Sequence, residues 1–384
     1  IIETIIEKAA KKLNISSENI RKINLLKEDQ WKNHLPGIRC KLHTRMTVKD
    51  TLLKALSVAG PKPKAREGKK VGRGIATAMA TFEFGNAPGY KGTGADITMF
   101  SDGSINVQIG FPEVGQGITG VITRLVSEFF GIEENKISII HCDTHTTPKA
   151  GSLGASRATV NAGNAILDAA QKLKQKLENY AKEYLKTDKN IKFKKGNFYI
   201  KDKNVLEFEK LMDYCYIEGK DLSAHGWYEI TFPEETRAFT FISSVVDVEV
   251  DEEIGEIKVL QVVSCHDSGK VIYEDGARGQ LLGGAIMSLG GALFEEFIMK
   301  DGKPLTPSFA EYIIPTAKDI PGKNIALFIE CPGEFGPNGA KGLGEHALHT
   351  VAPAFVNALF DATDVLITHL PVTPERLLKA LKKI

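Results

Sequence analysis

The sequence predicts an α+β fold built from two pseudo-repeated strand–helix subdomains. Strands lead into helices twice along the chain, first over residues 95–130 and again over residues 239–296. Each of these parts also contains two β-like runs joined by a short turn, at 101–104 and at 251–255, as expected of antiparallel hairpins. At 384 residues the chain is long enough to bury one large or two medium cores.

The first 70 residues are expected to form a helical segment followed by a linker. Apolar residues recur at helical spacing over 1–13, a shorter helix is predicted through residues 21–26, and a third is predicted near 48–59. Residues 61–70 are basic and rich in residues that break helices, which is typical of a solvated surface linker.

Residues 71–188 are predicted to form the first subdomain. Strands are expected at 74–84, 95–100 and 105–110, followed by a helix over 119–130 that ends at Gly131, a residue type common just after helices. A strand over 137–140 and a long helix running to about residue 185 complete this part.

Residues 189–235 read as an insertion with short strands and one helix over 206–214, and residues 236–384 as the second subdomain. The second subdomain should contain strands at 239–250 and 256–266, a helix over 279–296 and a glycine-rich loop. A helix from about residue 350, a strand over 365–369 and a final helix with Pro374 at its first position follow.

Composition excludes several classes of function. The balance of 49 basic and 48 acidic residues gives no reason to expect nucleic acid or an anionic membrane as a partner. No apolar run is long enough to cross a membrane, and the N-terminal residues do not resemble a signal peptide. Because the chain opens in mid-helix without Met, we expect it to be part of something longer.

The five cysteines are scattered and include no C-x-x-C pair, so neither a zinc ribbon nor an iron–sulfur cluster is expected in this chain. They are predicted to be reduced thiols in a cytoplasmic protein. His141 and His145 follow a predicted strand and would not converge as a helical pair does, so no metal site is predicted there.

The most informative stretch is the loop over residues 332–345. It contains five glycines, at 333, 336, 339, 342 and 344, and ends in Glu345. Glycine permits positive φ and close approach of backbone to a ligand, and the spacing is not that of a P-loop. Two interpretations remain: a structural turn that ends in a surface glutamate, or a carboxylate fixed at the floor of a cofactor site.

Four predicted helices begin at similar glycine-containing segments: 115–117, 154–157, 279–280 and 342–345. Helix N-termini present unpaired N–H groups and a positive dipole end, which suit phosphates and polar heterocycle edges. Together they predict a large polar cofactor that contains pyrophosphate and is held mainly by backbone amides.

The same motifs resemble those of the molybdenum hydroxylases, the xanthine dehydrogenase and aldehyde oxidase family. The resemblance rests on segments 114–117, 154–159, 279–284 and 336–345, in that order, with 312–316 and 370–375 as further matches. It covers nearly the whole chain and corresponds to the second molybdopterin-binding domain of the molybdenum subunit. The subdomains would accordingly be of the molybdopterin-binding type.

The resemblance implies a molybdopterin cofactor with molybdenum, in its cytosine dinucleotide form, lying across the helix starts. Gly115, Gln116 and Gly117 would hold the pterin-phosphate region, and Gln280 would hydrogen-bond the pterin. The pyrophosphate and nucleotide would contact Ala155, Ser156, Arg157 and Thr159. Gly342 and Gly344 would let the loop approach the cofactor, which brings its own sulfur ligands, so no protein ligand to the metal is expected.

Glu345 would be the catalytic base of this family's reaction, in which an electron-poor carbon is hydroxylated with water as the oxygen source. A base in this role has to lie near the metal, partly desolvated and fixed in place. The substrate expected from the resemblance is a small N-heterocycle, purine-like or nicotinate-like. Alternatives are an aldehyde-oxidising member of the family and a non-catalytic scaffold that has lost the cofactor.

The family's first cofactor domain is missing from this sequence. We therefore expect a partner chain or a further N-terminal part to supply the other half of the molybdenum subunit. FAD and 2Fe-2S clusters are expected on other subunits of a hetero-oligomer. His346, directly after Glu345, is interpreted as the first residue of a helix, without a catalytic duty.

Overall fold

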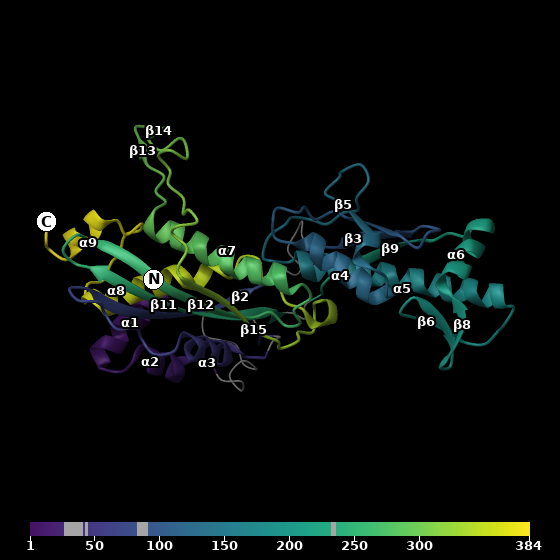
Figure 1. The fold of residues 1–384 in the computed structure, drawn as a ribbon, viewed down its shortest axis with the longest axis horizontal. Coiled ribbons are helices and arrows are strands. Elements are labelled where there is room, and N and C mark those ends of the chain that lie inside the picture. The colour runs from purple at the N-terminus through teal and green to yellow at the C-terminus, as the bar shows by residue number, and fades with distance from the viewer. Residues whose placement is uncertain (27–40, 43–44, 83–90, 232–235) are drawn as a thin grey trace.

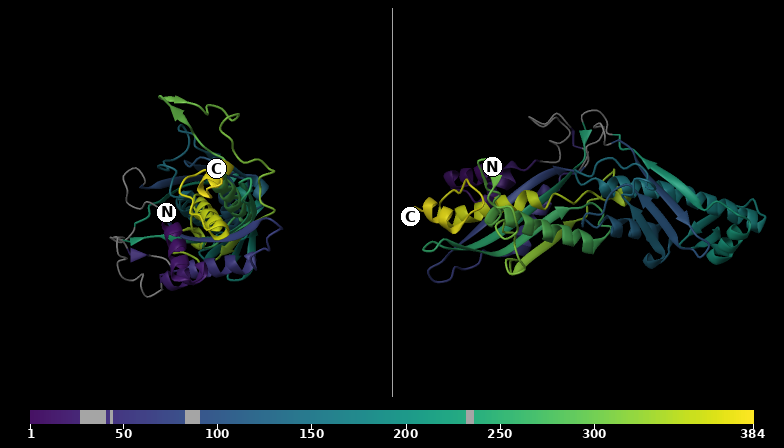
Figure 2. Two further views of the ribbon diagram at one scale, coloured as in Figure 1. Left: turned by 90° about the vertical axis from the view of Figure 1, so that its left-hand side faces the viewer. Right: turned by 90° about the horizontal axis from the view of Figure 1, so that it is seen from above.

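The structure, a computed structural model, describes residues 1–26, 41–42, 45–82, 91–231 and 236–384. Two bodies lie end to end along the long axis of the molecule (Figure 1). Figure 2 shows that both termini lie at the same end, in the body formed largely by the C-terminal residues. This α+β arrangement confirms the predicted fold class.

The body that carries the termini is built on a four-stranded sheet in the order β15-β12-β11-β2. The strands are β2 (Lys70–Thr81), β11 (Phe239–Asp251), β12 (Glu256–Asp267) and β15 (Lys323–Ile329). β11 pairs antiparallel with both β2 and β12, whereas β12 and β15 are parallel. The 12- and 13-residue strands pair along most of their length, which gives the body a long, rigid floor.

Helices cover both faces of this sheet. Because successive strand residues point to opposite faces, Val246 and Val248 pack against α7 (Glu274–Leu293) and α8 (Leu348–Thr363), whereas Val245 packs against α3 (Val48–Ala59). β2 approaches α8 so closely that a Cβ atom on Gly74 would lie 1.8 Å from the carbonyl oxygen of Ala354. Glycine is therefore required on this face of β2.

The second body contains a sheet in the order β5-β4-β3-β9. β3 (Thr93–Met99) pairs antiparallel with β4 (Ile105–Ile109) and β9 (Ser223–Tyr228), and β4 is parallel to β5 (Ile137–His141). Helices α4 (Ile118–Phe130) and α5 (Ala158–Leu185) bury their apolar faces against it in one core. A small sheet of β6 (Ile191–Lys194), β7 (Asn197–Ile200) and β8 (Lys203–Glu207) lies at the far end with α6 (Phe208–Ile217).

The remaining elements surround the first body. α1 (Ile2–Leu13) and α2 (Ser17–Asn24) precede α3, and α9 (Pro374–Ala380) closes the chain with Thr373 capping its N-terminus. β13 (Met299–Lys300) and β14 (Lys303–Pro304) form a hairpin that projects from the body (Figure 1). β1 (Lys41–Leu42) pairs in parallel with β10 (Thr236–Arg237).

Several predicted elements are confirmed, including the hairpins at 101–104 and 251–255 and the helix that ends at Gly131. Two predictions are wrong. The helix expected from residue 279 begins at Glu274, where two acidic residues suit a helix start, so Gly279 and Gln280 lie inside α7. Residues 365–369 form no strand; Ile367 is instead packed into the core beneath α8.

The two bodies are not consecutive segments of the chain. β2, from the predicted first subdomain, is an edge strand of the sheet that the C-terminal residues complete. β9, from the predicted insertion, is an edge strand of the other sheet. Local sequence patterns do not reveal strand partners, so the predicted segment boundaries remain a prediction and the strand pairing is the structural finding.

Candidate functional site

A cavity of about 370 Å³ lies where the two bodies meet. It is walled by the residues before α4 and α5 on one side, and by the start of α7 and the glycine loop on the other. The side chains and backbone that line it belong to Val114, Gln116, Gly117, Val121, Leu153, Gly154, Ser156, Ala158, Thr159, Ser268, Lys270, Val271, Ile272, Tyr273, Gly276, Ala277, Gln280, Ala340, Lys341, Leu343, Gly344 and Glu345.

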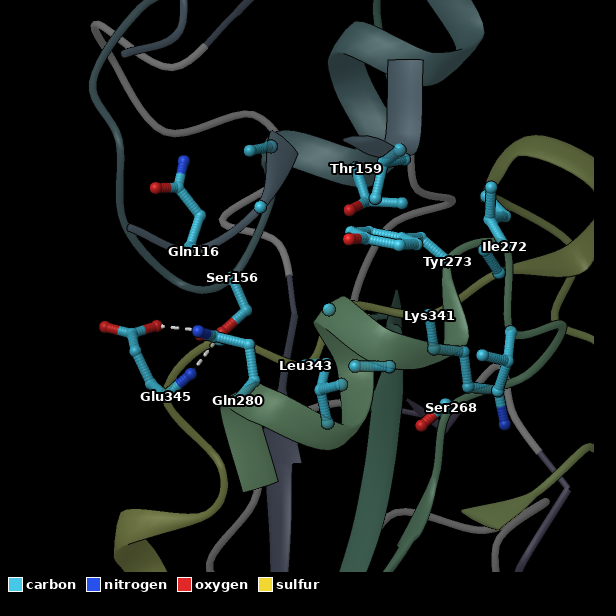
Figure 3. Close-up of a pocket in the computed structure, with 18 of the residues that line it drawn as sticks. Gln116, Ser156, Thr159, Ser268, Ile272, Tyr273, Gln280, Lys341, Leu343 and Glu345 are labelled. Atoms are coloured by element: carbon cyan, nitrogen blue, oxygen red, sulfur yellow. Dashed lines mark hydrogen bonds between the residues drawn. The ribbon is translucent and has the colours of Figure 1, made fainter. Parts of the chain in front are cut away.

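Polar side chains gather at one end of the cavity. Figure 3 shows Gln116, Ser156, Gln280 and Glu345 toward this end, and Ile272 and Tyr273 toward the other. Three of these four side chains are uncharged at neutral pH, and each carries hydrogen-bonding groups. The cavity can therefore hold a polar group at this end, whereas the other end combines Ile272 and Tyr273 with the polar Ser268 and Lys341.

Glu345 and Ser156 are joined by two hydrogen bonds across the junction of the bodies. The Ser156 hydroxyl donates to Glu345 Oε2 at 3.1 Å and accepts from the Glu345 backbone N–H at 3.0 Å. Ser156 can reach this position because Ala155 and Ser156 adopt left-handed backbone conformations, with φ of 49° and 52°. The Glu345 side chain remains exposed, whereas the sequence argument expects partial desolvation.

Gly342 brings the glycine loop against the backbone of Ser156. A Cβ atom placed on Gly342 would lie 2.2 Å from the carbonyl oxygen of Ser156 and 2.7 Å from Phe82 Cβ. Neither atom belongs to a flexible side-chain end, so any larger residue would push the two bodies apart. The loop glycine therefore packs protein backbone against protein backbone; it does not line the cavity itself.

The N-terminus of α4 is occupied by a carboxylate from its own loop. Glu113 accepts backbone hydrogen bonds from Gly115 at 3.0 Å, Gly117 at 2.9 Å and Thr119 at 3.0 Å. Burial alone would raise the pKa of Glu113, but the hydrogen bonds from Thr119, Gly117 and Gly115 outweigh it, so the pKa lies below its usual value. The amides of Gly115 and Gly117, predicted to hold phosphate, are thus bound to Glu113.

Gln116 is oriented by the same loop. Its Nε2 donates to the carbonyl of Pro112 at 2.8 Å, and its Oε1 accepts from the backbone N–H of Val114 at 2.7 Å. One amide hydrogen of the side chain is left over from these two bonds. Gln116 is therefore held in place at the polar end of the cavity with one donor to offer.

Arg157 is not at the cavity surface, although the sequence predicts that it contacts pyrophosphate. Its side chain is fully buried, and Nη1 donates to the carbonyls of Ala150 at 3.1 Å and Ser152 at 3.0 Å. The guanidinium also lies over the Phe111 ring, 5.3 Å from its centroid. Arg157 therefore holds the loop before α5 and does not line the cavity.

A buried ion pair holds the glycine loop to the end of β12. Lys341 Nζ lies 2.7 Å from Asp267 Oδ2, and both side chains are completely buried. Asp267 also accepts from Thr47 Oγ1 at 2.5 Å and from the Gly269 backbone at 3.1 Å. The Lys341 backbone N–H donates to Ser268 at 2.9 Å, so side chain and backbone both anchor the loop.

Two buried histidines lie directly behind Glu345. His266 Nε2 is 2.9 Å from His346 Nδ1, and the rings stack with centroids 5.1 Å apart. Burial, then His346 and Lys341, hold the pKa of His266 well below its usual value. Burial and then His349 lower the pKa of His346 to about 4. His346 is thus a core residue that precedes α8, which corrects its interpretation as the first residue of a helix.

The structure brings together most, but not all, of the residues singled out by sequence. Seven of them line the cavity: Gln116, Gly117, Ser156, Thr159, Gln280, Gly344 and Glu345. Gly115, Ala155, Arg157 and Gly342 do not line it. Sequence reasoning missed Glu113, Ser268, Tyr273 and Lys341; among these, Glu113 could have been found, because an acidic residue before a helix start is a capping signal.

Within the described ranges, no group of three or more His, Cys, Asp or Glu side chains converges in a way that could hold a metal ion. The helices in those ranges include none with the length and apolar character needed to cross a membrane.

Comparison with protein families gives one match to this chain. Residues 52–321 match the model of the molybdopterin cofactor-binding domain. The match includes the helix starts of α4 and α5 and the cavity-lining part of α7.

Two curated relatives illustrate the similarity. The chain is 30% identical over 319 residues to the 6-hydroxypseudooxynicotine dehydrogenase complex subunit gamma of Paenarthrobacter nicotinovorans, covering 81% of this chain and 40% of the relative. It is 33% identical over 316 residues to a putative xanthine dehydrogenase molybdenum-binding subunit of Escherichia coli (strain K12), covering 79% and 41%. The chain thus spans about two fifths of the length of these relatives.

A solved structure shares the fold. Reconstituted CO dehydrogenase from Oligotropha carboxidovorans superposes with a TM-score of 0.86 at 23% identity, over all of this chain and 50% of that one.

Proposed function

This chain belongs to the molybdopterin cofactor-binding domain family of the molybdenum hydroxylases, and on that premise we propose that it is the second cofactor-binding domain of a molybdenum subunit. The proposed reaction is hydroxylation of an electron-poor carbon of a small N-heterocycle, with water as the oxygen source. The observation that carries the proposal is the placement of Glu345, hydrogen-bonded to Ser156, at the polar end of the cavity.

The residues of the cavity fit a molybdopterin. Hydroxyl and amide groups of Gln116, Ser156, Thr159 and Gln280 line it without a cluster of metal-ligating side chains, as suits a group that brings its own sulfur ligands. Tyr273, Ile272 and Leu343 give the flat and apolar surface against which a ring system packs. When bound, the cofactor supplies the two-electron oxidation.

The two helix starts at the cavity are suited to different parts of such a ligand. At α4 the Glu113 carboxylate already bonds three amides, and its negative charge opposes a phosphate. At α5 the first-turn amides lack intrahelical partners, and Ala158 and Thr159 of that turn line the cavity. We therefore place the pyrophosphate toward α5, and assign Gln116 to the polar, reactive end of the cofactor.

Glu345 would accept the proton that the attacking water-derived oxygen gives up. Ser156 holds one carboxylate oxygen, Oε2, which leaves Oε1 free to act as base within the hydrogen bonds shown. Glu345 is exposed in this structure, whereas this chemistry needs a site from which water is excluded. The cofactor, the substrate and the remaining part of the subunit would provide that cover.

The substrate assignment rests on the two relatives, whose names contain xanthine and 6-hydroxypseudooxynicotine. Both are electron-poor N-heterocycles, and this favours a purine-like or pyridine-like substrate over an aldehyde. Because the chain spans about two fifths of these relatives, the other half of the subunit is a proposed partner. The cytosine dinucleotide form of the cofactor and separate subunits with FAD and 2Fe-2S clusters are proposed from the family resemblance.

The test is replacement of Glu345 in the complete complex. Glu345→Gln should lower kcat by about 10³-fold or more while the molybdenum content stays unchanged, because the amide accepts the Ser156 bond but cannot take up a proton. Glu274→Gln is the matched control, since Glu274 is an exposed carboxylate at the start of α7 that does not line the cavity. Equal activity of the two variants would contradict the proposal.

A further inference from the structure

Behind Glu345 a line of hydrogen bonds runs from the cavity into the core. Ser268, which lines the cavity, lies with its Oγ 2.8 Å from His266 Nδ1. His266 Nε2 lies 2.9 Å from His346 Nδ1, and His346 Nε2 lies 3.4 Å from the carbonyl oxygen of Thr81. His266 and His346 are 0% and 1% exposed, so both rings are shielded from solvent.

The partners assign the proton on each ring. A carbonyl oxygen only accepts, so His346 Nε2 carries a hydrogen and its Nδ1, in the neutral ring, is an acceptor. His266 Nε2 must then be the donor, and its Nδ1 accepts from the Ser268 hydroxyl. Thr240 Oγ1, 3.4 Å from His266 Nε2, donates to the Asp267 carbonyl and leaves its oxygen free to accept, which agrees with this direction.

The backbone of Glu345 is hydrogen-bonded through both its N–H and its carbonyl. Its own N–H is bonded to Ser156, its carbonyl accepts from the Leu348 N–H at 3.2 Å, and the next residue is His346. Among the described residues, Ser156 is the hydrogen-bond partner of the exposed carboxylate, so the direction of the carboxylate depends on where the backbone of the 345–348 turn is fixed.

We infer that His346 is the positioning residue of Glu345. Ser268 holds His266, His266 holds His346, and with both rings neutral this line keeps the 345–348 turn in place at the cavity. A second proton on His346 would occupy Nδ1, which faces the Nε2–H of His266 at 2.9 Å. The link would then require His266 to carry its proton on Nδ1 and the Ser268 hydroxyl to accept, which reverses the whole line of hydrogen bonds. The role assigned to Glu345 rests on the proposed function, whereas the effect of His346 on the position of the 345–348 turn does not.

The surrounding charges favour the neutral pair. Lys341 from the glycine loop and His349 from α8 each act against a positive charge here. Asp267, the nearest buried carboxylate on β12, is already bonded to Lys341 and Thr47. The faces from β11 and β2 contribute the uncharged Thr240 hydroxyl and the Thr81 carbonyl, and Glu345 lies on the exposed side.

The test compares two replacements in the native complex. His346→Asn keeps an acceptor near the position of Nδ1, whereas His346→Leu keeps volume and removes it. We expect His346→Leu to speed amide hydrogen exchange over residues 345–348 by about tenfold and to lower kcat by about tenfold with little change in KM. His346→Asn should recover most of both losses, and His369→Ala, a change at an exposed histidine beyond α8, should resemble wild type.

Site-resolved histidine C2-hydrogen exchange on the wild-type complex is the second measurement. It should show slow exchange at His266 and His346 and no titration of either ring near pH 6.5. Titration of both near pH 6.5, equal losses in the Asn and Leu variants, or unchanged amide exchange in His346→Leu would each overturn the inference. If the complex held no molybdenum and did not turn over, the proposed function would fail, while amide exchange would still decide the seating of the turn.

Discussion

The buried Lys341–Asp267 pair gives the strongest stability prediction. Among the residues that the structure describes, Lys341, Thr47 and Gly269 donate to Asp267. Lys341→Met therefore leaves a completely buried carboxylate with Thr47 and Gly269 as its remaining partners there. Breaking a buried pair by removing one partner costs about 3–5 kcal/mol, because the remaining charge is neither hydrated nor neutralised. We therefore expect Lys341→Met to lower the free energy of unfolding by about this amount.

The loss should be visible as a lower urea midpoint in far-ultraviolet circular dichroism. Lys172→Met is the control, because the Lys172–Asp168 pair is 48% and 39% exposed and is expected to contribute about 1 kcal/mol or less. Adding Asp267→Asn to Lys341→Met should cost less than the sum of the two single changes, since it removes the stranded charge. A Lys341→Met loss within that of Lys172→Met, or simple additivity, would refute the reasoning.

Three further changes test the site and its surroundings. Gly279→Ala should stabilise the chain by about 0.5–1 kcal/mol in thermal unfolding, because Gly279 lies inside α7 with nothing within 4 Å of an added Cβ atom; destabilisation would contradict its placement. Lowering the pH should reduce the free energy of unfolding. The pKa of His346 falls from 6.5 to about 4 on folding, so as the pH falls the unfolded chain takes up the proton before the folded chain does. About 3 kcal/mol of stability is lost between these two values. That loss should be smaller in His346→Asn, and an unchanged pH dependence would argue against a neutral buried ring. Glu113→Ala should cost about 1–2 kcal/mol near pH 7 by leaving three amides of the α4 start without their acceptor, and the cost should shrink as the pH falls through the lowered pKa of Glu113; the same loss at every pH would exclude a charged cap.

Local pattern predicts much of this fold because many of its elements are locally determined. Gly131 ends α4 in a left-handed conformation, Thr373 and Pro374 start α9, and the turn at 251–255 joins two strands, all as short-range rules require. The predicted start of α7, at residue 279, is five residues too late. Gly276 and Gly279 are poor helix formers, so the acidic first turn at Glu274 and Asp275 was not recognised as a helix start. Gly276 is needed there, since its Cβ atom would meet the Tyr273 ring at 2.5 Å.

The sequence predicts those parts of the candidate site that depend on local backbone conformation. It does not predict the parts that depend on contacts between distant elements. Glycine spacing singled out the loop that ends in Glu345, whereas the role of Glu345 came from the family resemblance and stays a prediction. The structure places Glu345 and Ser156 in hydrogen-bond contact across 189 residues of sequence. The burial of Arg157 against Phe111 and the pairing of His266 with His346 depend on which elements meet, and a single sequence does not record that. For the same reason the sequence does not reveal that β2 pairs with β11.

The central claim is that the cavity between the two bodies holds a molybdopterin cofactor. The most direct test is metal and nucleotide analysis of the complex purified from its native host under molybdate-replete conditions. We predict close to one molybdenum atom for each copy of this chain, with CMP released by acid hydrolysis. A complete, folded complex that contains neither molybdenum nor a pterin would contradict the claim and favour a scaffold role.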